Sequence, residues 1–296
     1  MSEISVNKIR LGRLRGLIDA DYDNPDWRGI FENPDDLMSL PGAKTIKDSP
    51  TTNAVVVSVE VGGATRSLHV KKLKRRGLLF TLKYLFQRSR ARRLFVRHLA
   101  LIERGVPTLR PVAALSERWG PFLKRSYLIT EQLDALPFFT LWEKEIYPEG
   151  NLPARRRTVM LAVAKLIALM HRAGVFHRDL KSSNILVKTA GEPVIADLDG
   201  AKTARSLSYG QRVRDLARLS TSLVPLANMA DRHVFLKTYI AELGTGDNIK
   251  LMGRDIVVAG LKILNSKRSK GKYDEYEYRY LDAFARRQRE WLDSGA

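Results

Sequence analysis

One short stretch of the chain holds three side-chain types that together suit the transfer of a phosphoryl group. Residues 177–184 read HRDLKSSN and contain Asp179, Lys181 and Asn184. A carboxylate can orient an acceptor hydroxyl and take its proton, a lysine can offset charge on the moving phosphoryl, and an amide oxygen can hold magnesium. Asp179 and Lys181 are therefore candidate catalytic residues, and Asn184 is a candidate magnesium ligand. The alternative interpretation is a solvated polar loop that follows a helix.

The flanking segments predict elements that would position this loop. Residues 153–172 carry apolar side chains at helical spacing, and Gly174 is a natural stop just beyond them. Two short apolar runs, 185–187 and 194–196, are separated by a turn and indicate a small hairpin. That hairpin would bring Asp197 back beside the loop, where a second magnesium ligand belongs.

The loop as a whole, H-R-D-L-K-x-x-N, resembles the catalytic loop of protein-kinase-like enzymes, and Asp197 stands where they have the aspartate of D-F-G. Leu198 and Asp199 replace the Phe and Gly of that motif. The resulting D-L-D, together with the G-V-P-T-x-x-P segment at 105–111, is similar to the bacterial lipopolysaccharide kinases of heptose or Kdo sugars. The role of Asp199, as a metal ligand or as a turn residue, stays open.

The resemblance implies an α+β, bilobal protein-kinase-like fold, with a small antiparallel-sheet lobe and a larger, mainly helical lobe. It implies ATP and Mg²⁺ as cofactors and a sugar hydroxyl of a lipopolysaccharide core as acceptor. We expect an N-terminal extension over residues 1–42, a nucleotide-binding lobe over 43–134, a catalytic lobe over 135–264 and a basic, charged tail or helix over 265–296.

In the predicted small lobe, residues 54–61 and 64–71 indicate two strands joined by a turn at Gly62-Gly63. The second strand ends in Leu-His-Val-Lys, which resembles the V-A-I-K strand whose lysine holds the α- and β-phosphates, so Lys71 is the candidate. Lys72 would point to the opposite face. The alternative is that Lys71 merely begins a basic stretch. Residues 131–133 are the expected hinge, where Glu131 and Leu133 would hold adenine.

Two expected parts of a nucleotide site are not evident. Residues 47–53, where a glycine-rich loop would lie, contain no glycine. No acid stands where the partner of Lys71 would be expected. Glu103 or Glu60 could serve, or the pairing could be absent.

The formal net charge of +19 favours anionic partners and says nothing of the fold. Residues 71–93 include ten Lys or Arg and no acid, around an apolar run at 78–86. This pattern fits an element at an anionic membrane surface, or a connection packed on the protein. No nucleic-acid-binding motif accompanies the charge, so nucleic acid is not expected.

The chain contains no cysteine, which excludes disulfides and a cysteine nucleophile. It has no apolar run of membrane-spanning length, and its first twenty residues are too charged for a secretory signal. These features favour the cytoplasm, and the resemblance adds a peripheral position on the cytoplasmic face of the inner membrane. The sequence leaves the oligomeric state open.

The segment after Gly200 bears on the acceptor. Only about ten residues separate it from the next predicted helix at 212–219, and no A-P-E follows. A platform for an extended peptide is therefore not expected, which favours a small or glycolipid acceptor. The alternatives are a kinase of proteins or other small molecules on the same fold, or a pseudokinase that binds an anionic glycolipid or membrane surface.

Overall fold

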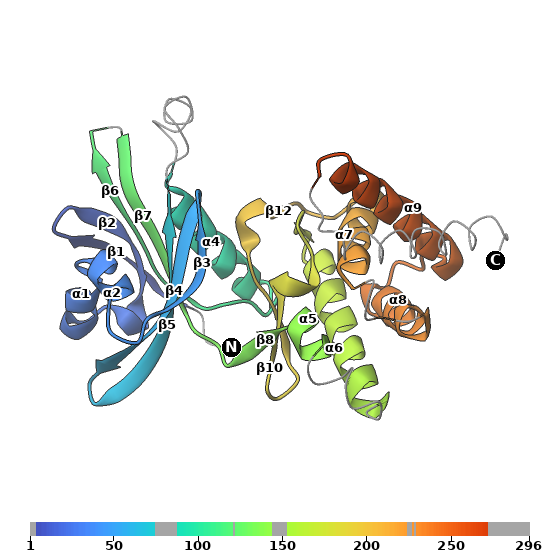
Figure 1. Ribbon diagram of the computed structural model, residues 1–296, viewed down its shortest axis with the longest axis horizontal. Coiled ribbons are helices and arrows are strands. Elements are labelled where there is room, and N and C mark those ends of the chain that lie inside the picture. The colour runs from blue at the N-terminus through green and yellow to red at the C-terminus, as the bar shows by residue number, and fades with distance from the viewer. Residues whose placement is uncertain are drawn as a thin grey trace. The chain divides into compact units, whose positions relative to one another are not determined.

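A computed structural model describes residues 4–74, 88–120, 122–143, 153–223, 227 and 229–271 (Figure 1). The chain divides into two compact units. The N-terminal unit comprises Met1–Arg104 and Thr108–Leu133, and the C-terminal unit comprises Gly105–Pro107 and Asp134–Ala296.

The N-terminal unit is built on one seven-stranded sheet in the order β1-β2-β6-β7-β5-β4-β3, with every neighbouring pair antiparallel. Its strands are β1 (Val6–Leu11), β2 (Leu14–Asp19), β3 (Lys44–Ser49), β4 (Thr52–Val61), β5 (Ala64–Leu73), β6 (Pro111–Trp119) and β7 (Phe122–Glu131). Its helices are the 3₁₀ turn η1 (Ala20–Tyr22), α1 (Pro25–Phe31), α2 (Pro34–Met38) and α4 (Arg90–Glu103).

Helices cover both faces of this sheet (Figure 1). On one face α1 and α2 bury Trp27, Phe31 and Leu37 against alternate apolar residues of the strands, which forms the core of the unit. On the other face α4 packs on β6, β7 and β2. The alternation of side chains along each strand thus separates two differently covered surfaces.

The C-terminal unit is mainly helical. Its helices are α5 (Phe138–Leu141), α6 (Pro153–Arg172), α7 (Tyr209–Ser222), α8 (Met229–Leu243) and α9 (Ile249–Arg268), with 3₁₀ turns η3 (Ser182–Asn184) and η4 (Leu198–Gly200). Its strands are β8 (Ala135–Pro137), β9 (Val175–Phe176), β10 (Ile185–Lys188), β11 (Pro193–Ile195) and β12 (Lys202–Thr203). Helix α6 packs on α8, and α7 packs on α9.

The α+β fold class predicted from the sequence is confirmed, and so are the main elements around the motifs. Helix α6 covers the predicted residues and is followed by Gly174 at φ +75°. Strands β10 and β11 form the predicted hairpin, and β4 and β5 pair through the Gly62-Gly63 turn.

Residues 6–19 were not predicted as strands. They form β1 and β2, which extend the sheet beyond β6. The alternation there is interrupted by Gly12 and by the consecutive buried residues 17–19, so it was easily missed. The whole apolar run at 78–86 lies outside the described residues, and so does most of the predicted tail or helix at 265–296. Among the described helices, none has the length and apolar character needed to cross a membrane.

Candidate active site

The three candidate residues of the 177–184 loop, Asp179, Lys181 and Asn184, lie close together. Lys181 Nζ lies 3.4 Å from Asp179 Oδ2, and the Asn184 side-chain amide donates to the Asp179 backbone oxygen at 2.9 Å. The same amide nitrogen lies 3.4 Å from Asp179 Oδ2. Asn184 is buried, whereas the side chains of Asp179 and Lys181 are 56% and 45% exposed. The carboxylate of Asp179 and the ammonium group of Lys181 are therefore accessible to solvent, while the buried Asn184 side chain holds the backbone at Asp179 in place.

The β10–β11 hairpin returns the chain to this loop, as predicted. The amide of Ala196 donates to the backbone oxygen of Asn184 at 2.9 Å. Asp197 follows directly, half-buried and at φ +52°, a left-handed conformation that is uncommon for a residue with a side chain. The structure thus places Asp197 next in the chain to a residue that is bonded to Asn184.

His177 supports the loop and is not exposed for proton transfer. Its side chain is fully buried, and its Nε2 lies 3.0 Å from the Ala196 backbone oxygen. The amide of Asp179 points at His177 Nδ1 at 3.3 Å. The imidazole therefore ties the loop to the hairpin, and both ring nitrogens are occupied by backbone groups.

Asp215 of α7 anchors the start of the loop, and sequence reasoning missed it. Its carboxylate is fully buried and accepts the amides of His177 at 2.7 Å and Arg178 at 2.9 Å. Arg178 has φ +71°, a strained backbone that the two hydrogen bonds help to hold. A signal was present: Asp215 is an acid on the buried face of a helix, beside Leu216 and Leu219.

The end of the same helix anchors the middle of the loop. Ser222 Oγ accepts the amide of Ser182 at 2.8 Å, and Ser182 Oγ lies 3.3 Å from the Ser222 backbone oxygen. Helix α7 thus contacts the loop on both sides of Asp179. The position of the acidic side chain is set by a rigid element rather than by the loop alone.

The donor set suits a hard cation. The Asn184 amide nitrogen points to Asp179, which leaves its Oδ1 for another partner, and Asp197 supplies a carboxylate nearby in the fold. Mg²⁺ favours such oxygen ligands and commonly takes one or two protein groups together with substrate phosphates. Within the described part of the chain, no group of three or more His, Cys, Asp or Glu is placed to hold a metal ion by itself.

Lys71 lies in the N-terminal unit on β5, an interior strand of the sheet between β7 and β4. Its cross-strand neighbours are Ala54 on β4 and Leu128 on β7. Lys72 points to the other face, where its Nζ lies 2.8 Å from Asp35 at α2. Glu60 pairs with Thr65, six positions along β4 from Ala54 or about 20 Å away, so it is too distant to be the acid beside Lys71.

The expected phosphate-binding segment, residues 47–53, forms a tight hairpin between β3 and β4. Asp48 pairs with Asn53 and Ser49 pairs with Thr52 across the sheet. Ser49 Oγ also donates to the Thr52 backbone oxygen at 3.1 Å. The segment is therefore a hairpin turn that contains no glycine.

The two predicted hinge residues, Glu131 and Leu133, differ in whether their backbone amides are already hydrogen-bonded within the protein. The amide of Glu131 donates to the Arg110 oxygen at 3.0 Å, and its side chain accepts from Tyr22 at 2.6 Å. The Leu133 oxygen accepts from the Gln132 side chain at 2.8 Å, while the Leu133 amide has no hydrogen-bond partner in the described chain. Of the two, only Leu133 therefore has a donor that a ligand could use.

In the C-terminal unit the structure brings together Asp179, Lys181, Asn184 and the chain at Asp197. Lys71, Glu131 and Leu133 belong to the N-terminal unit. An antiparallel sheet in one unit and a helical unit that carries this loop define a protein-kinase-like fold. A solved structure, WaaP in complex with acyl carrier protein, agrees: its TM-score is 0.56 at 25% identity, over 82% of this chain and 94% of that chain.

The family model described as the lipopolysaccharide kinase (Kdo/WaaP) family matches residues 45–239, more than half of the chain. The protein therefore belongs to the lipopolysaccharide kinase (Kdo/WaaP) family. The resemblance inferred from the loop and from the D-L-D motif is confirmed.

Relatives in the family have two different sugar acceptors in their names. The lipopolysaccharide core heptose(I) kinase WaaP of Pseudomonas aeruginosa is 33% identical over 148 residues, which are 47% of this chain and 55% of that protein. The 3-deoxy-D-manno-octulosonic acid kinase of Xylella fastidiosa is 32% identical over 127 residues, or 43% of this chain and 47% of that protein. The chain thus spans about half the length of the curated relatives it matches.

Proposed function

We propose that this protein is an ATP- and Mg²⁺-dependent kinase that transfers the γ-phosphoryl group to a hydroxyl of a lipopolysaccharide inner-core sugar, heptose or Kdo. The observation that carries the proposal is the Asp179–Lys181–Asn184 loop, held on Asp215, inside the segment that matches the family. The names of the relatives support the acceptor class.

In this proposal each residue has one task. Asp179 orients the acceptor hydroxyl and takes its proton as the bond to phosphorus forms and the bond to the leaving oxygen of ADP breaks. Lys181, 3.4 Å from Asp179, offsets charge on the transferred group. Asn184 and Asp197 would hold Mg²⁺, which when bound neutralises charge on the nucleotide phosphates.

The N-terminal unit would bind the nucleotide. Lys71 supports the α- and β-phosphates, and the hinge at Glu131 and Leu133 supports adenine through the Leu133 amide. We accordingly propose residues 43–134 as the nucleotide lobe and 135–264 as the catalytic lobe. The glycolipid acceptor implies a place at the cytoplasmic face of the inner membrane, with anionic lipid as a neighbour.

The test is transfer of label from γ-labelled ATP with Mg²⁺. The acceptors are core glycolipids truncated to end in Kdo or in heptose, with a generic protein as a third acceptor. Label in one glycolipid, reduced at least ~100-fold by Asp179→Asn and by Asp197→Asn, is expected. Asp255→Asn, an acid of the same unit bonded to Tyr209, is the matched control and should keep activity.

Transfer to protein alone would overturn the acceptor. Wild-type rates in both site variants would overturn the assignment of Asp179 and Asp197. Nucleotide binding without transfer to any of the three acceptors would favour the pseudokinase alternative.

A further inference from the structure

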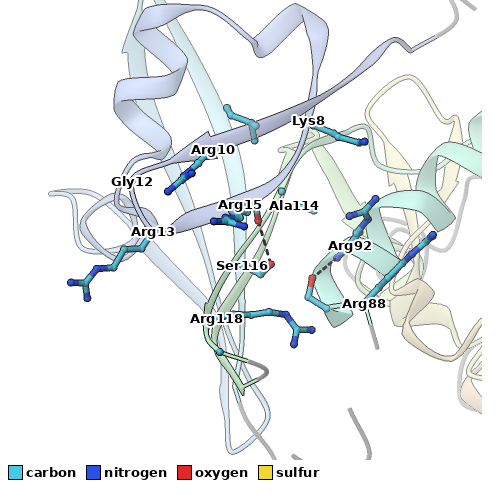
Figure 2. A pocket seen from close by; sticks show the side chains of 14 residues that line it. Lys8, Arg10, Gly12, Arg13, Arg15, Arg88, Arg92, Ala114, Ser116 and Arg118 are labelled. Carbon is cyan, nitrogen blue, oxygen red and sulfur yellow. Dashed lines mark hydrogen bonds between the residues drawn. The ribbon is translucent and has the colours of Figure 1, made fainter. Parts of the chain in front are cut away.

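A strongly basic cavity of about 870 Å³ lies in the N-terminal unit, among strands β1, β2 and β6 and the start of α4 (Figure 2). None of the residues assigned to phosphoryl transfer lines it. Its volume is that of a site for a small molecule or a large polar head group. The basic residues that line it are Lys8, Arg10, Arg13, Arg15, Arg88, Arg92 and Arg118, and none of the described residues that line it is acidic.

Strand register gathers these cations on one face of the sheet. Arg10 lies opposite Arg15, and Arg15 lies opposite Ser116. Lys8, two positions before Arg10, projects to the same side. Figure 2 shows these side chains on the strand side of the pocket, and Arg88 and Arg92 on the helix side. The cations therefore form two walls with a gap between them.

The floor of the cavity is made of small residues. A side chain at Gly16 would place its first carbon 1.9 Å from the Ala114 backbone oxygen, so the backbones of β2 and β6 can come this close only with glycine there. Ala114 and Ser116 line the same surface, and Ser116 Oγ lies 3.3 Å from the Arg15 backbone oxygen. Long cationic side chains around a bare floor leave room for a ligand between them.

Within the part of the chain that the structure describes, most of the charge of this cavity is not paired with an acid. Lys8, Arg10, Arg13, Arg15, Arg88 and Arg92 form no ion pair within the described residues. On the opposite face of the same sheet, by contrast, Glu117 pairs with Arg125 at 2.6 Å and with Lys124 at 3.2 Å. Clefts lined by one sign of charge concentrate ligands of the other sign.

Arg92 gives a second, independent indication that the cavity holds an anionic ligand. Its Nε is buried and has no hydrogen-bond partner in the described chain, although an unsatisfied buried donor is costly. Ser89 caps the fourteen-residue helix α4 at this point and accepts the Arg92 amide at 3.2 Å. The start of a helix also carries partial positive charge, which adds to that of the side chains.

We propose that this cavity binds the phosphorylated, multiply anionic part of the glycolipid acceptor. Guanidinium groups on facing walls suit a compact group with several separate phosphates or carboxylates, since each arginine can bind such a group in a bidentate manner. Cations on two facing walls can contact a compact group from both sides, which a flat bilayer surface does not allow. The choice of a glycolipid rests on the proposed function, whereas the anion site itself does not.

The experiment is direct binding to the full chain, without ATP. One probe is inositol hexakisphosphate, with inorganic phosphate as the singly substituted comparison. The other is a bisphosphorylated glycolipid in neutral detergent micelles, compared with the same glycolipid after phosphatase treatment. The pocket variants are Arg10→Gln/Arg15→Gln and, separately, Arg92→Gln. Arg254→Gln/Lys262→Gln, from exposed positions on α9, removes the same charge as the double variant.

We expect affinity for hexakisphosphate and for the phosphorylated glycolipid to fall about tenfold for each arginine removed and to be kept in the control variant. Phosphatase treatment should abolish the difference between wild type and pocket variants. Thermal unfolding identifies any variant that fails to fold, and Arg92→Gln keeps the test valid if the double variant is lost.

If wild type and the two pocket variants bound both probes with equal affinity, the proposal that this cavity is an anion-binding site would be wrong. Loss of hexakisphosphate binding with unchanged glycolipid binding would overturn the glycolipid as occupant. Because neither probe requires turnover, absence of phosphotransfer would count against the proposed function and not against this cavity.

Discussion

Asp215 accepts the backbone amide of His177 at 2.7 Å, across 38 positions of the sequence, and so ties helix α7 to the first residue of the candidate catalytic loop. Its second oxygen accepts the amide of Arg178 at 2.9 Å. A fully buried carboxylate with two amide donors is a stable anchor, since each charge-assisted hydrogen bond is strong where water is excluded.

Replacing Asp215 by asparagine should loosen this anchor. The new NH₂ group would face an amide donor, which leaves a buried donor unsatisfied at a cost of about 1–3 kcal/mol. We expect that loss in the free energy of unfolding, and a kcat about 10- to 100-fold lower with ATP affinity kept.

Asp255→Asn is the matched control for this change. The Asp255 carboxylate accepts the Tyr209 hydroxyl at 2.8 Å, and an asparagine oxygen can still do so. Urea unfolding and steady-state kinetics measure both variants. A normal kcat in a folded Asp215→Asn protein would contradict the positioning role.

Lys71 and Lys72 are neighbours on β5 that should have opposite effects when changed to methionine. Lys71→Met should lower phosphotransfer at least ~100-fold with little change in stability, because its charge is assigned to the nucleotide. Lys72→Met removes the ion pair with Asp35 and the contact over the Tyr127 ring. It should cost no more than about 1 kcal/mol of stability, since the pair is one-third exposed, and should keep the rate. The reverse pattern would show that Lys72 faces the nucleotide.

Gly174 should be the least replaceable glycine near the loop. It has φ +75°, and an added Cβ would lie 2.0 Å from the Ala204 backbone oxygen. Gly174→Ala should therefore cost more than the ~1–2 kcal/mol of left-handed strain alone. Gly191→Ala, at φ +87° with open space around it, should cost only that strain. Urea unfolding compares the two, and equal losses would rule out the contact with Ala204.

His171 should make stability fall in mild acid. Burial lowers the pKa of this imidazole, although the nearby Asp215 carboxylate opposes the effect. Below the usual histidine pKa of about 6.5 the unfolded chain then binds a proton that the folded protein does not, so stability decreases as pH falls through 6.5. The loss from this residue should grow as the pH falls further below 6.5.

The measurement is unfolding of wild type and of His171→Gln between pH 7.5 and 5.5. The variant is destabilised overall, because His171 Nδ1 lies 2.8 Å from the Tyr239 hydroxyl in wild type. Its pH dependence, however, should be flatter. Parallel profiles for the two proteins would contradict a neutral His171 in the folded state.

The parts of the site that could be predicted from the sequence are those made by neighbouring residues. Asp179, Lys181 and Asn184 lie within one loop. The hairpin that returns the chain to Asp197 is marked by turn residues between its two strands, and α6 is marked by apolar residues at helical spacing. Such signals are local, because hydrogen-bonding type and side-chain period act over a few residues. The alternation of Lys71 and Lys72 across β5 was likewise predictable from strand geometry alone.

The sequence by itself therefore determined the family motifs, the fold class and the excess of positive charge. Only the tertiary structure decided that Asp215 accepts hydrogen bonds from the loop, that Asp35 forms an ion pair with Lys72, and that cations from three segments line one cavity. Each of these depends on strand pairing or helix packing between residues far apart in the chain. No local periodicity specifies such contacts, since the partner is chosen by the burial of the whole unit.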